Sequence, residues 1–310
     1  MNQDALLAGR VAIVTGGARG IGLAITEALH ELGATVVVAD SGVSIGGENP
    51  EPSVAQGVAV RLGARARAFG EDLCAAGSPG RLVDFAVESC GAIDIVVNNA
   101  AILRDALIFK AEQVDWERVI ANNLSVPFSL LAAATPRMRE QQKNGRAPGR
   151  IVNMVSSAGL FGNFGQSAYA SAKAGLFGLT RVVAMDMARS QVACNAIAPF
   201  AATRVTDSIR PANDTQADYK RRALTVPAQY VANLTAFLCS GLHEMTGQLF
   251  GVRGRELFVF SQPRPVARSL MKAGPDRDFA GLSEFLGGEA AAKLTSLATD
   301  LEHFSSEPLV

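Results

Sequence analysis

Two residues stand out for their possible chemistry: Tyr169 and Lys173, four positions apart in an alanine- and leucine-rich stretch (167–189) that predicts a helix. Positions i and i+4 share one face of a helix, so the two side chains point the same way. An ammonium group beside a phenol lowers the phenol pKa from its reference of about 10, which permits proton exchange near neutral pH. The alternative is a solvated tyrosine packed against a lysine stem.

A serine precedes this pair at a position suited to ligand binding. Ser156 ends an apolar run, residues 150–155, that predicts a strand, and it lies thirteen positions before Tyr169. Open α/β sheets bind their ligands at the carboxyl ends of their strands. We therefore expect Ser156 to lie near a ligand.

The N-terminal region has the pattern of a dinucleotide-binding unit. Residues 11–14 predict a buried parallel strand, which leads into a glycine-rich turn and then a helical pattern. Gly16 permits a tight turn, and Gly20 and Gly22 let the backbone approach a pyrophosphate at the helix N-terminus. Asp40 ends the next strand, 18 residues after Gly22, near the spacing expected for a carboxylate that binds ribose hydroxyls. An ordinary glycine-rich turn without a ligand is disfavoured, because the preceding strand, the following helix and the acidic residue Asp40 are all present.

Asp40 also bears on the choice of cofactor. A carboxylate accepts hydrogen bonds from both ribose hydroxyls and repels a 2′-phosphate. The next residue is Ser41 rather than an arginine that could pair with that phosphate, and Arg19 is the one nearby cation in the turn. The pattern therefore favours NAD over NADP.

These motifs together resemble those of the short-chain dehydrogenases/reductases, over about residues 8 to 260. The matching positions are Thr15, Gly16, Gly20 and Gly22 in the glycine-rich turn, Asn98, Asn99, Ala100 and Ala101 after a strand at 93–97, and Asn123, Ser156, Tyr169 and Lys173 at the catalytic positions. Ala101 stands where the family usually has glycine. Five motifs in the family order make the resemblance specific.

The resemblance implies roles for these residues. Tyr169 takes the proton of a substrate hydroxyl, Lys173 lowers the Tyr169 pKa and holds the nicotinamide ribose, and Ser156 orients the substrate oxygen. Asn123 fixes a water molecule, although a kink in a helix at 112–142 also explains an asparagine there. The implied cofactor-binding residues are Gly16, Arg19, Gly20, Ile21, Gly22, Asp40, Asp72, Leu73, Asn99, Ala100, Ala101, Tyr169, Lys173, Pro199 and Thr203.

Within the family, residues 99–105, 159–166 and 194–199 resemble the (3R)-hydroxyacyl-CoA dehydrogenase units of type 2 multifunctional enzymes, also known as 17β-hydroxysteroid dehydrogenase type 4. An enlarged segment after the second strand, 41–52, is similar too and predicts a surface loop. The leading hypothesis is an NAD-dependent 3-hydroxyacyl-CoA dehydrogenase, whose substrate could include a steroid side-chain thioester. The alternatives are a hydroxysteroid or other secondary-alcohol dehydrogenase and a non-catalytic NAD-binding subunit, which the complete catalytic set disfavours.

A CoA substrate would need cations for its phosphates. The candidates are Arg204, Arg210, Arg221, Arg222, Arg253 and Arg255. Most of them are better explained as residues of solvated helix faces or of salt bridges between subunits, so no single arginine is assigned to CoA.

Composition limits the other possibilities. The chain of 310 residues is 48% hydrophobic with a formal net charge of +0, which indicates neither a nucleic-acid partner nor an anionic membrane. No apolar run reaches membrane-spanning length, and a strand that starts by residue 11 leaves no room for a signal peptide. The histidines lack metal-ligand spacing, so we expect no metal site. The cysteines are scattered without a Cys-x-x-Cys pair, which favours a cytoplasmic location.

Alternating strands and helices predict an α/β fold with a doubly wound parallel sheet, the Rossmann fold. We expect residues 1–260 to form an NAD-binding catalytic domain and residues 261–310 a C-terminal helical extension, with helical periodicity at 283–286 and 290–301. The extension either packs on a neighbouring subunit or covers part of a long substrate. The expected partners are a small-molecule substrate, most simply an acyl-CoA, and further copies of the chain in a homodimer or homotetramer.

Overall fold

The structure is a computed structural model that describes residues 5–208, 211, 213–261, 267, 279–288 and 290–293. The chain divides into two compact units: the first comprises residues 1–260 and 299–310, and the second comprises residues 261–298. The second unit contains helix α11 (Phe279–Gly287) and the single turn η5 (Ala291–Lys293). The helix expected at 283–286 is therefore present, whereas most of the one expected at 290–301 lies outside the described residues.

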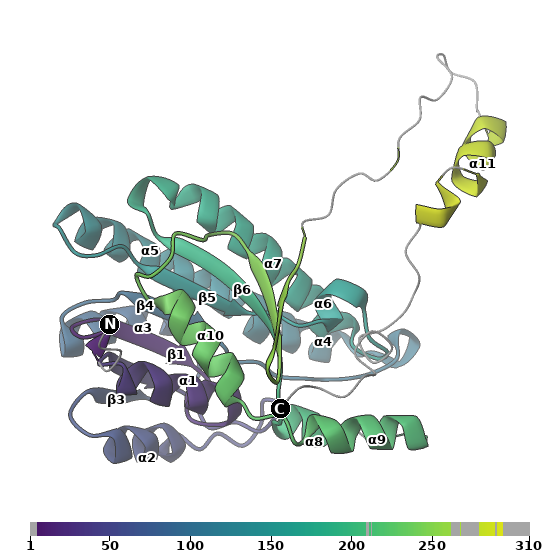
Figure 1. The fold of residues 1–310 in the computed structure, drawn as a ribbon. Coiled ribbons are helices and arrows are strands. Elements are labelled where there is room, and N and C mark those ends of the chain that lie inside the picture. The colour runs from purple at the N-terminus through teal and green to yellow at the C-terminus, as the bar shows by residue number, and fades with distance from the viewer. Residues whose placement is uncertain are drawn as a thin grey trace. The chain divides into compact units, whose positions relative to one another are not determined.

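The first unit is built on one eight-stranded sheet with the order β3-β2-β1-β4-β5-β6-β7-β8 (Figure 1). All neighbouring strands are parallel except β7 and β8, which are antiparallel. The predicted doubly wound parallel sheet is confirmed, with one antiparallel edge strand added. The strands are β1 (Val11–Thr15), β2 (Thr35–Ala39), β3 (Ala66–Phe69), β4 (Ile95–Asn98), β5 (Arg150–Met154), β6 (Ala193–Phe200), β7 (Leu249–Arg253) and β8 (Glu256–Val259).

Helices cover both faces of the sheet (Figure 1). Side chains alternate between the faces of a strand, so Ala12 and Val14 enter one hydrophobic core whereas Ile13 enters the other. Helices α1, α2 and α10 supply the first core, and α3, α5 and α7 supply the second. The helices are α1 (Gly20–Glu31), α2 (Ser53–Leu62), α3 (Ser78–Cys90), α4 (Gln113–Ile120), α5 (Val126–Lys143), α6 (Ala158–Phe161), α7 (Ser167–Asp186), α8 (Arg204–Ser208), α9 (Asp214–Ala223) and α10 (Gln229–Cys239), with short turns η2 (Ile108–Lys110) and η4 (Ala188–Ser190).

The helix expected at 112–142 is interrupted. A π-helical turn, η3 (Ala121–Ser125), separates α4 from α5, and the amide of Val126 donates to the carbonyl of Ala121, five residues back. By length and composition alone, the run from Gln113 to Lys143 could cross a membrane. Its buried side chains, Leu130 and Met138 among them, pack in the second core of the sheet, which accounts for its apolar composition.

The loop between β2 and α2, residues 41–52, is folded on itself. The amide of Glu51 donates to the carbonyl of Ser41, and the amide of Ser44 donates to the carbonyl of Glu48. Gly42 has φ +76, and a Cβ there would lie 2.1 Å from the carbonyl oxygen of Glu51. Only glycine fits at this close approach.

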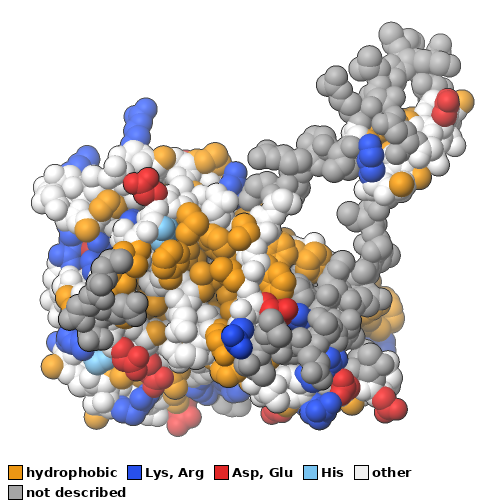
Figure 2. Space-filling model, in the orientation of Figure 1, with side chains coloured by type: hydrophobic (Ala, Val, Ile, Leu, Met, Phe, Trp, Pro, Cys, Tyr) orange, Lys and Arg blue, Asp and Glu red, His pale blue; other side chains and the backbone are white. Residues whose placement is uncertain are grey.

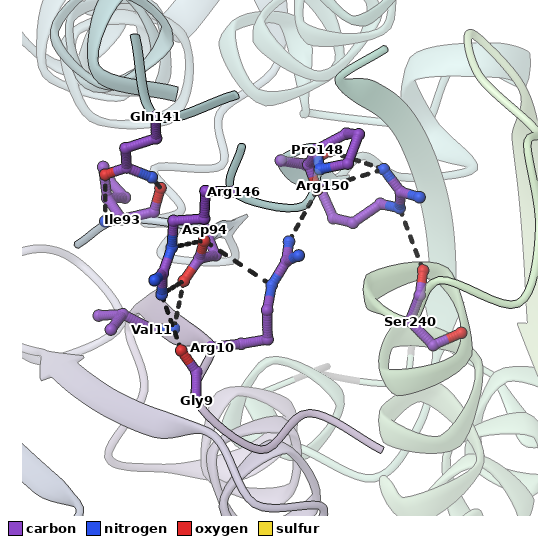
Figure 3. A network of polar contacts seen from close by, with 11 residues as sticks. Gly9, Arg10, Val11, Ile93, Asp94, Gln141, Arg146, Pro148, Arg150 and Ser240 are labelled. Carbon is purple, nitrogen blue, oxygen red and sulfur yellow. Dashed lines mark hydrogen bonds and ion pairs between the residues drawn. The ribbon is translucent and has the colours of Figure 1, made fainter. Parts of the chain in front are cut away.

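A buried ion cluster joins the amino ends of the central strands (Figure 3). The glycine-rich turn follows the carboxyl end of β1, so the cluster lies at the opposite end of the strands. The carboxylate of Asp94 has no exposed surface and accepts two 2.6 Å hydrogen bonds from the guanidinium of Arg146. It also accepts a 2.7 Å bond from the amide of Val11, and Arg10 Nε lies 3.8 Å from it. The cluster joins β1 and β4 to the segment that precedes β5.

Candidate active site

The carboxyl ends of the parallel strands open into a cleft. The predicted cofactor-binding residues from Gly16 to Thr203 all line it: Gly16, Arg19, Gly20, Ile21, Gly22, Asp40, Asp72, Leu73, Asn99, Ala100, Ala101, Tyr169, Lys173, Pro199 and Thr203. They come from the loops after β1, β2, β3, β4 and β6, from the start of α1, from the end of β6 and from α7, so residues far apart in the chain lie at one edge of the sheet.

The glycine-rich turn has the shape needed to hold a pyrophosphate. Gly16 and Gly20 have φ +62 and +54, a backbone conformation that residues other than glycine rarely adopt. A Cβ on Gly22 would lie 2.0 Å from the carbonyl oxygen of Gly16, so the turn closes directly on the start of α1. Asn99 Nδ2 donates to the carbonyls of Thr15 (3.0 Å) and Gly16 (3.2 Å) and fixes the turn to the end of β4. The residues present therefore fit a dinucleotide.

Asp40 is held at the end of β2 by two backbone amides. Its Oδ2 accepts from the amide of Ala18 at 3.1 Å, and its Oδ1 accepts from the amide of Gly42 at 2.8 Å. Arg19 Nη2 lies 3.9 Å from the same carboxylate. Each carboxylate oxygen can accept more than one hydrogen bond, so ribose hydroxyls can still bind here.

A second arginine reaches this part of the cleft, and the sequence analysis did not place it there. Arg204, at the start of α8, lines the cleft and donates to the carbonyl of Val43 at 3.4 Å. Arg19 donates to the same carbonyl at 3.2 Å. Burial lowers the pKa of Arg204, with a smaller contribution from the positive charge of Arg19. Nothing in the local sequence links residues 43 and 204, which approach only through the fold.

The other candidate cations for CoA have different surroundings. Arg221 and Arg222 both form ion pairs with Asp218 on the same helix, α9. Arg253 is buried at the end of β7 and pairs with Glu256 at 2.5 Å, whereas Arg255 is exposed. Arg210 lies outside the described residues.

Tyr169 and Lys173 share one face of α7 and both line the cleft. Lys173 Nζ lies 5.7 Å from the centroid of the Tyr169 ring and donates a 2.7 Å hydrogen bond to the carbonyl of Met154, the last residue of β5. Lys173 is only 2% exposed, and burial lowers its pKa to about 8. A lysine with this pKa still carries its proton over most of the neutral range.

Ser156 follows Met154 and Val155, which line the cleft, and lies just outside the described lining. Its Oγ accepts a 3.2 Å hydrogen bond from the amide of Ala158 at the start of α6. The strand β5 therefore brings Ser156 to the same edge of the sheet as Lys173.

Asn123 lies inside the π-helical turn and is fully buried. Its side chain makes two 2.9 Å hydrogen bonds to the backbone of Ile102, accepting from the amide and donating to the carbonyl. The predicted irregularity of the helix is thus present. The contacts of Asn123 in this structure fix the segment that follows the Asn99–Ala101 motif.

The low pKa of Lys173 predicts a pH-dependent stability. The folded pKa of about 8 lies below the unfolded value of 10.5, so below pH 8 both states are protonated and the full cost of burying the ammonium is present. As pH rises from 8 toward 10.5 the folded state has lost that proton, and the cost disappears. Relative to a Lys173→Met variant, the wild type should gain about 3 kcal/mol over this window. Urea unfolding at each pH measures it, and parallel stability curves would contradict it.

The comparisons with known proteins agree with this geometry. The short chain dehydrogenase family model matches residues 10–216. The chain is 37% identical to hydroxyacyl-CoA dehydrogenase ChsB1 of Mycobacterium tuberculosis over 83% of this chain and 81% of that protein. It is 36% identical to the 3-oxoacyl-[acyl-carrier-protein] reductase FabG of Aquifex aeolicus over 80% of this chain and 97% of that protein.

The likeness to larger enzymes covers only a part of them. The chain is 36% identical to mouse peroxisomal multifunctional enzyme type 2 over 79% of its own length but only 31% of that enzyme. A crystal structure of a short chain dehydrogenase from Mycobacterium avium superposes with a TM-score of 0.78 and 34% identity, covering 94% of this chain and 97% of that one. The chain belongs to the short chain dehydrogenase family, an oxidoreductase family whose members generally bind NAD or NADP.

Proposed function

We propose that the protein is an NAD-dependent oxidoreductase that oxidises the secondary alcohol of a 3-hydroxyacyl-CoA, including steroid side-chain thioesters, to a ketone. The main support is the meeting of Tyr169, Lys173 and Asp40 in one cleft. The name of one relative, a hydroxyacyl-CoA dehydrogenase, supports this class of substrate.

The proposed chemistry divides between cofactor and protein. A bound nicotinamide dinucleotide supplies the hydride acceptor. Tyr169, as the phenolate, takes the proton from the substrate hydroxyl, and Lys173 stabilises that phenolate with its positive charge. Ser156 donates a hydrogen bond to the substrate oxygen and orients it. Asn123 supports this site by holding the backbone of Ile102.

Two other activities use the same residues. A 3-oxoacyl thioester reductase would run the reaction in the opposite direction, and the FabG relative favours that possibility. A hydroxysteroid or simple secondary-alcohol dehydrogenase would not need a CoA site. Asp40 argues against a reductase that depends on NADP, because its carboxylate would repel the 2′-phosphate.

The decisive experiment compares kcat/KM for a 3-hydroxyacyl-CoA, its truncated thioester without the nucleotide, and a free hydroxysteroid. Binding energy from the remote CoA group can position the reacting carbon, so the full thioester should lead by about tenfold or more. The advantage of the full thioester should be larger at low salt, because high salt screens the exposed charge pairs that would bind the CoA phosphates. Equal values for the full and truncated thioesters would favour the steroid or simple-alcohol activity, and no turnover with any substrate would favour a non-catalytic subunit.

Asp40→Ala tests the cofactor assignment. The substitution removes the acceptor for the ribose hydroxyls and leaves the Arg19 and Arg204 guanidiniums beside the site. We expect kcat/KM with NAD to fall about tenfold, whereas the discrimination against NADP relaxes. The measurement is kcat/KM with both cofactors for both proteins, and a wild-type preference for NADP would refute the assignment.

We also propose a homodimer or homotetramer in the cytoplasm. Figure 2 shows hydrophobic side chains gathered over the region of α10 and the β7–β8 edge. Exposed apolar residues there include Phe237, Leu242, Leu257 and Val259, the last of them 70% exposed. An apolar surface of this kind supports contact with another copy of the chain. Sedimentation equilibrium would measure the assembly state.

A further inference from the structure

The segment that follows the Asn99–Ala101 motif, residues 102–106, connects three parts of the site. Asn123 holds the backbone of Ile102 from the π-helical turn. The amide of Leu103 donates to the carbonyl of Ile45 at 2.9 Å, and the amide of Ala106 donates to the carbonyl of Gly165 at 2.8 Å, just before the helix that carries Tyr169. This connecting segment therefore contacts both the turn before α7 and the loop at 41–52.

The loop at 41–52 forms one wall of the cofactor cleft. Ser41, Val43, Ser44 and Ile45 line the cleft directly after Asp40. The loop is long and rich in glycine and proline, a composition that offers the unfolded loop many conformations. Something must hold it against the cleft if the wall is to exist before the dinucleotide binds.

The side chain of Arg104 bonds the connecting segment to this loop at two points. Its Nε donates to the carbonyl of Gly46 at 2.8 Å, and its Nη2 pairs with Glu48 Oε1 at 2.7 Å. Asp115 of α4 also lies near this guanidinium, with its Oδ1 3.8 Å from Arg104 Nε. Arg104 is 21% exposed and Glu48 57% exposed, so the bond to the Gly46 carbonyl is the better shielded of the two contacts.

The electrostatics agree with this pairing. The hydrogen bond from Arg104 lowers the pKa of Glu48, and the same bond raises the pKa of Arg104. Gly47, between the two contact points, packs close to Ile102, and a Cβ there would lie 3.2 Å from the Cδ1 atom of Ile102. The loop thus follows the surface of the connecting segment from Ile45 to Glu48.

We propose that Arg104 is a positioning residue that holds the loop at 41–52 as a preformed wall of the dinucleotide site. Holding the loop raises the fraction of molecules that are ready to bind, and the apparent dissociation constant of the dinucleotide falls by the same factor. Arg104 does not take part in proton or hydride transfer. The proposal rests on the proposed function only in requiring that the cleft binds a nicotinamide dinucleotide.

Arg104→Ala tests the proposal in the full-length protein, with NADH fluorescence titration as the direct measure of binding. We expect the dissociation constant for NADH to rise about fivefold, while kcat at saturating cofactor stays within about twofold of wild type. Arg104→Lys keeps the charge but has no planar fork for two acceptors, so it should give an intermediate value. Glu48→Gln should have a smaller effect than Arg104→Ala, because the carboxylate is exposed.

Arg61→Ala is the matched control. Arg61 pairs with Glu27 at 2.7 Å on the surface between α2 and α1, so this variant removes a similar ion pair. It should bind NADH like the wild type. An Arg104→Ala variant that binds NADH as the wild type does, or that loses kcat without losing affinity, would overturn the proposal, provided that its melting temperature shows it is folded.

A failure of the Arg104 proposal can be distinguished from a failure of the proposed function. If the wild type prefers NADPH, the cofactor assignment fails, and the same titration with NADPH still tests Arg104. If no acyl-CoA is oxidised, the dissociation constants still decide whether Arg104 positions the loop.

Discussion

Tyr169→Phe is expected to abolish alcohol oxidation while leaving dinucleotide binding intact. The variant keeps the ring that lies 5.7 Å from Lys173 Nζ but loses the oxygen that would accept the substrate proton. Loss of general acid–base catalysis costs roughly 10²- to 10⁴-fold in rate. Steady-state kcat and NADH fluorescence titration on the same preparation measure the two effects separately.

Tyr230→Phe is the control for this experiment. Tyr230 packs against the first hydrophobic core on α10, away from the cleft residues, so removing its hydroxyl should leave kcat unchanged. Near-normal turnover by Tyr169→Phe would show that another group takes the proton. A parallel loss of NADH affinity would instead point to a disturbed cleft.

Asp94→Ala is expected to destabilise the fold by about 3 kcal/mol or more. The buried carboxylate is shared by Arg146, Arg10 and the amide of Val11, so its removal leaves partly buried guanidiniums and a buried amide without their acceptor. The Arg10 side chain is 16% exposed, and this burial lowers its pKa. Urea unfolding measures the free energy of unfolding directly.

The matched control is Asp84→Ala, which removes an exposed carboxylate 3.4 Å from Arg137. Because both partners are at least half exposed, the loss should be below about 1 kcal/mol. The Asp94 cluster lies at the opposite end of the strands from the cleft, so Asp94→Ala protein that remains folded should keep its affinity for the dinucleotide. Equal stability losses in the two variants would contradict the importance of burial.

The sequence by itself was enough to predict the parallel strands and the edge of the sheet at which the cleft lies. The apolar runs alternate with helical patterns, and side-chain alternation sends Ala12 and Ile13 to opposite cores as the strand period requires. The glycines at 16, 20 and 22 and the spacing of Tyr169 and Lys173 are local signals, because each depends on backbone conformation within one turn or helix. All the predicted cofactor residues accordingly line one cleft.

Only the tertiary structure could reveal the contacts between loops. Arg104 hydrogen-bonds to Gly46 and Glu48. Arg204 hydrogen-bonds to Val43, and Arg146 hydrogen-bonds to Asp94, in both cases across long stretches of chain. The kink considered at Asn123 is present as a π-helical turn, but only the fold shows that this asparagine holds the backbone of Ile102. Hydrogen bonds of this kind have no sequence period, because which donor meets which acceptor depends on how the packed strands and helices bring distant loops together.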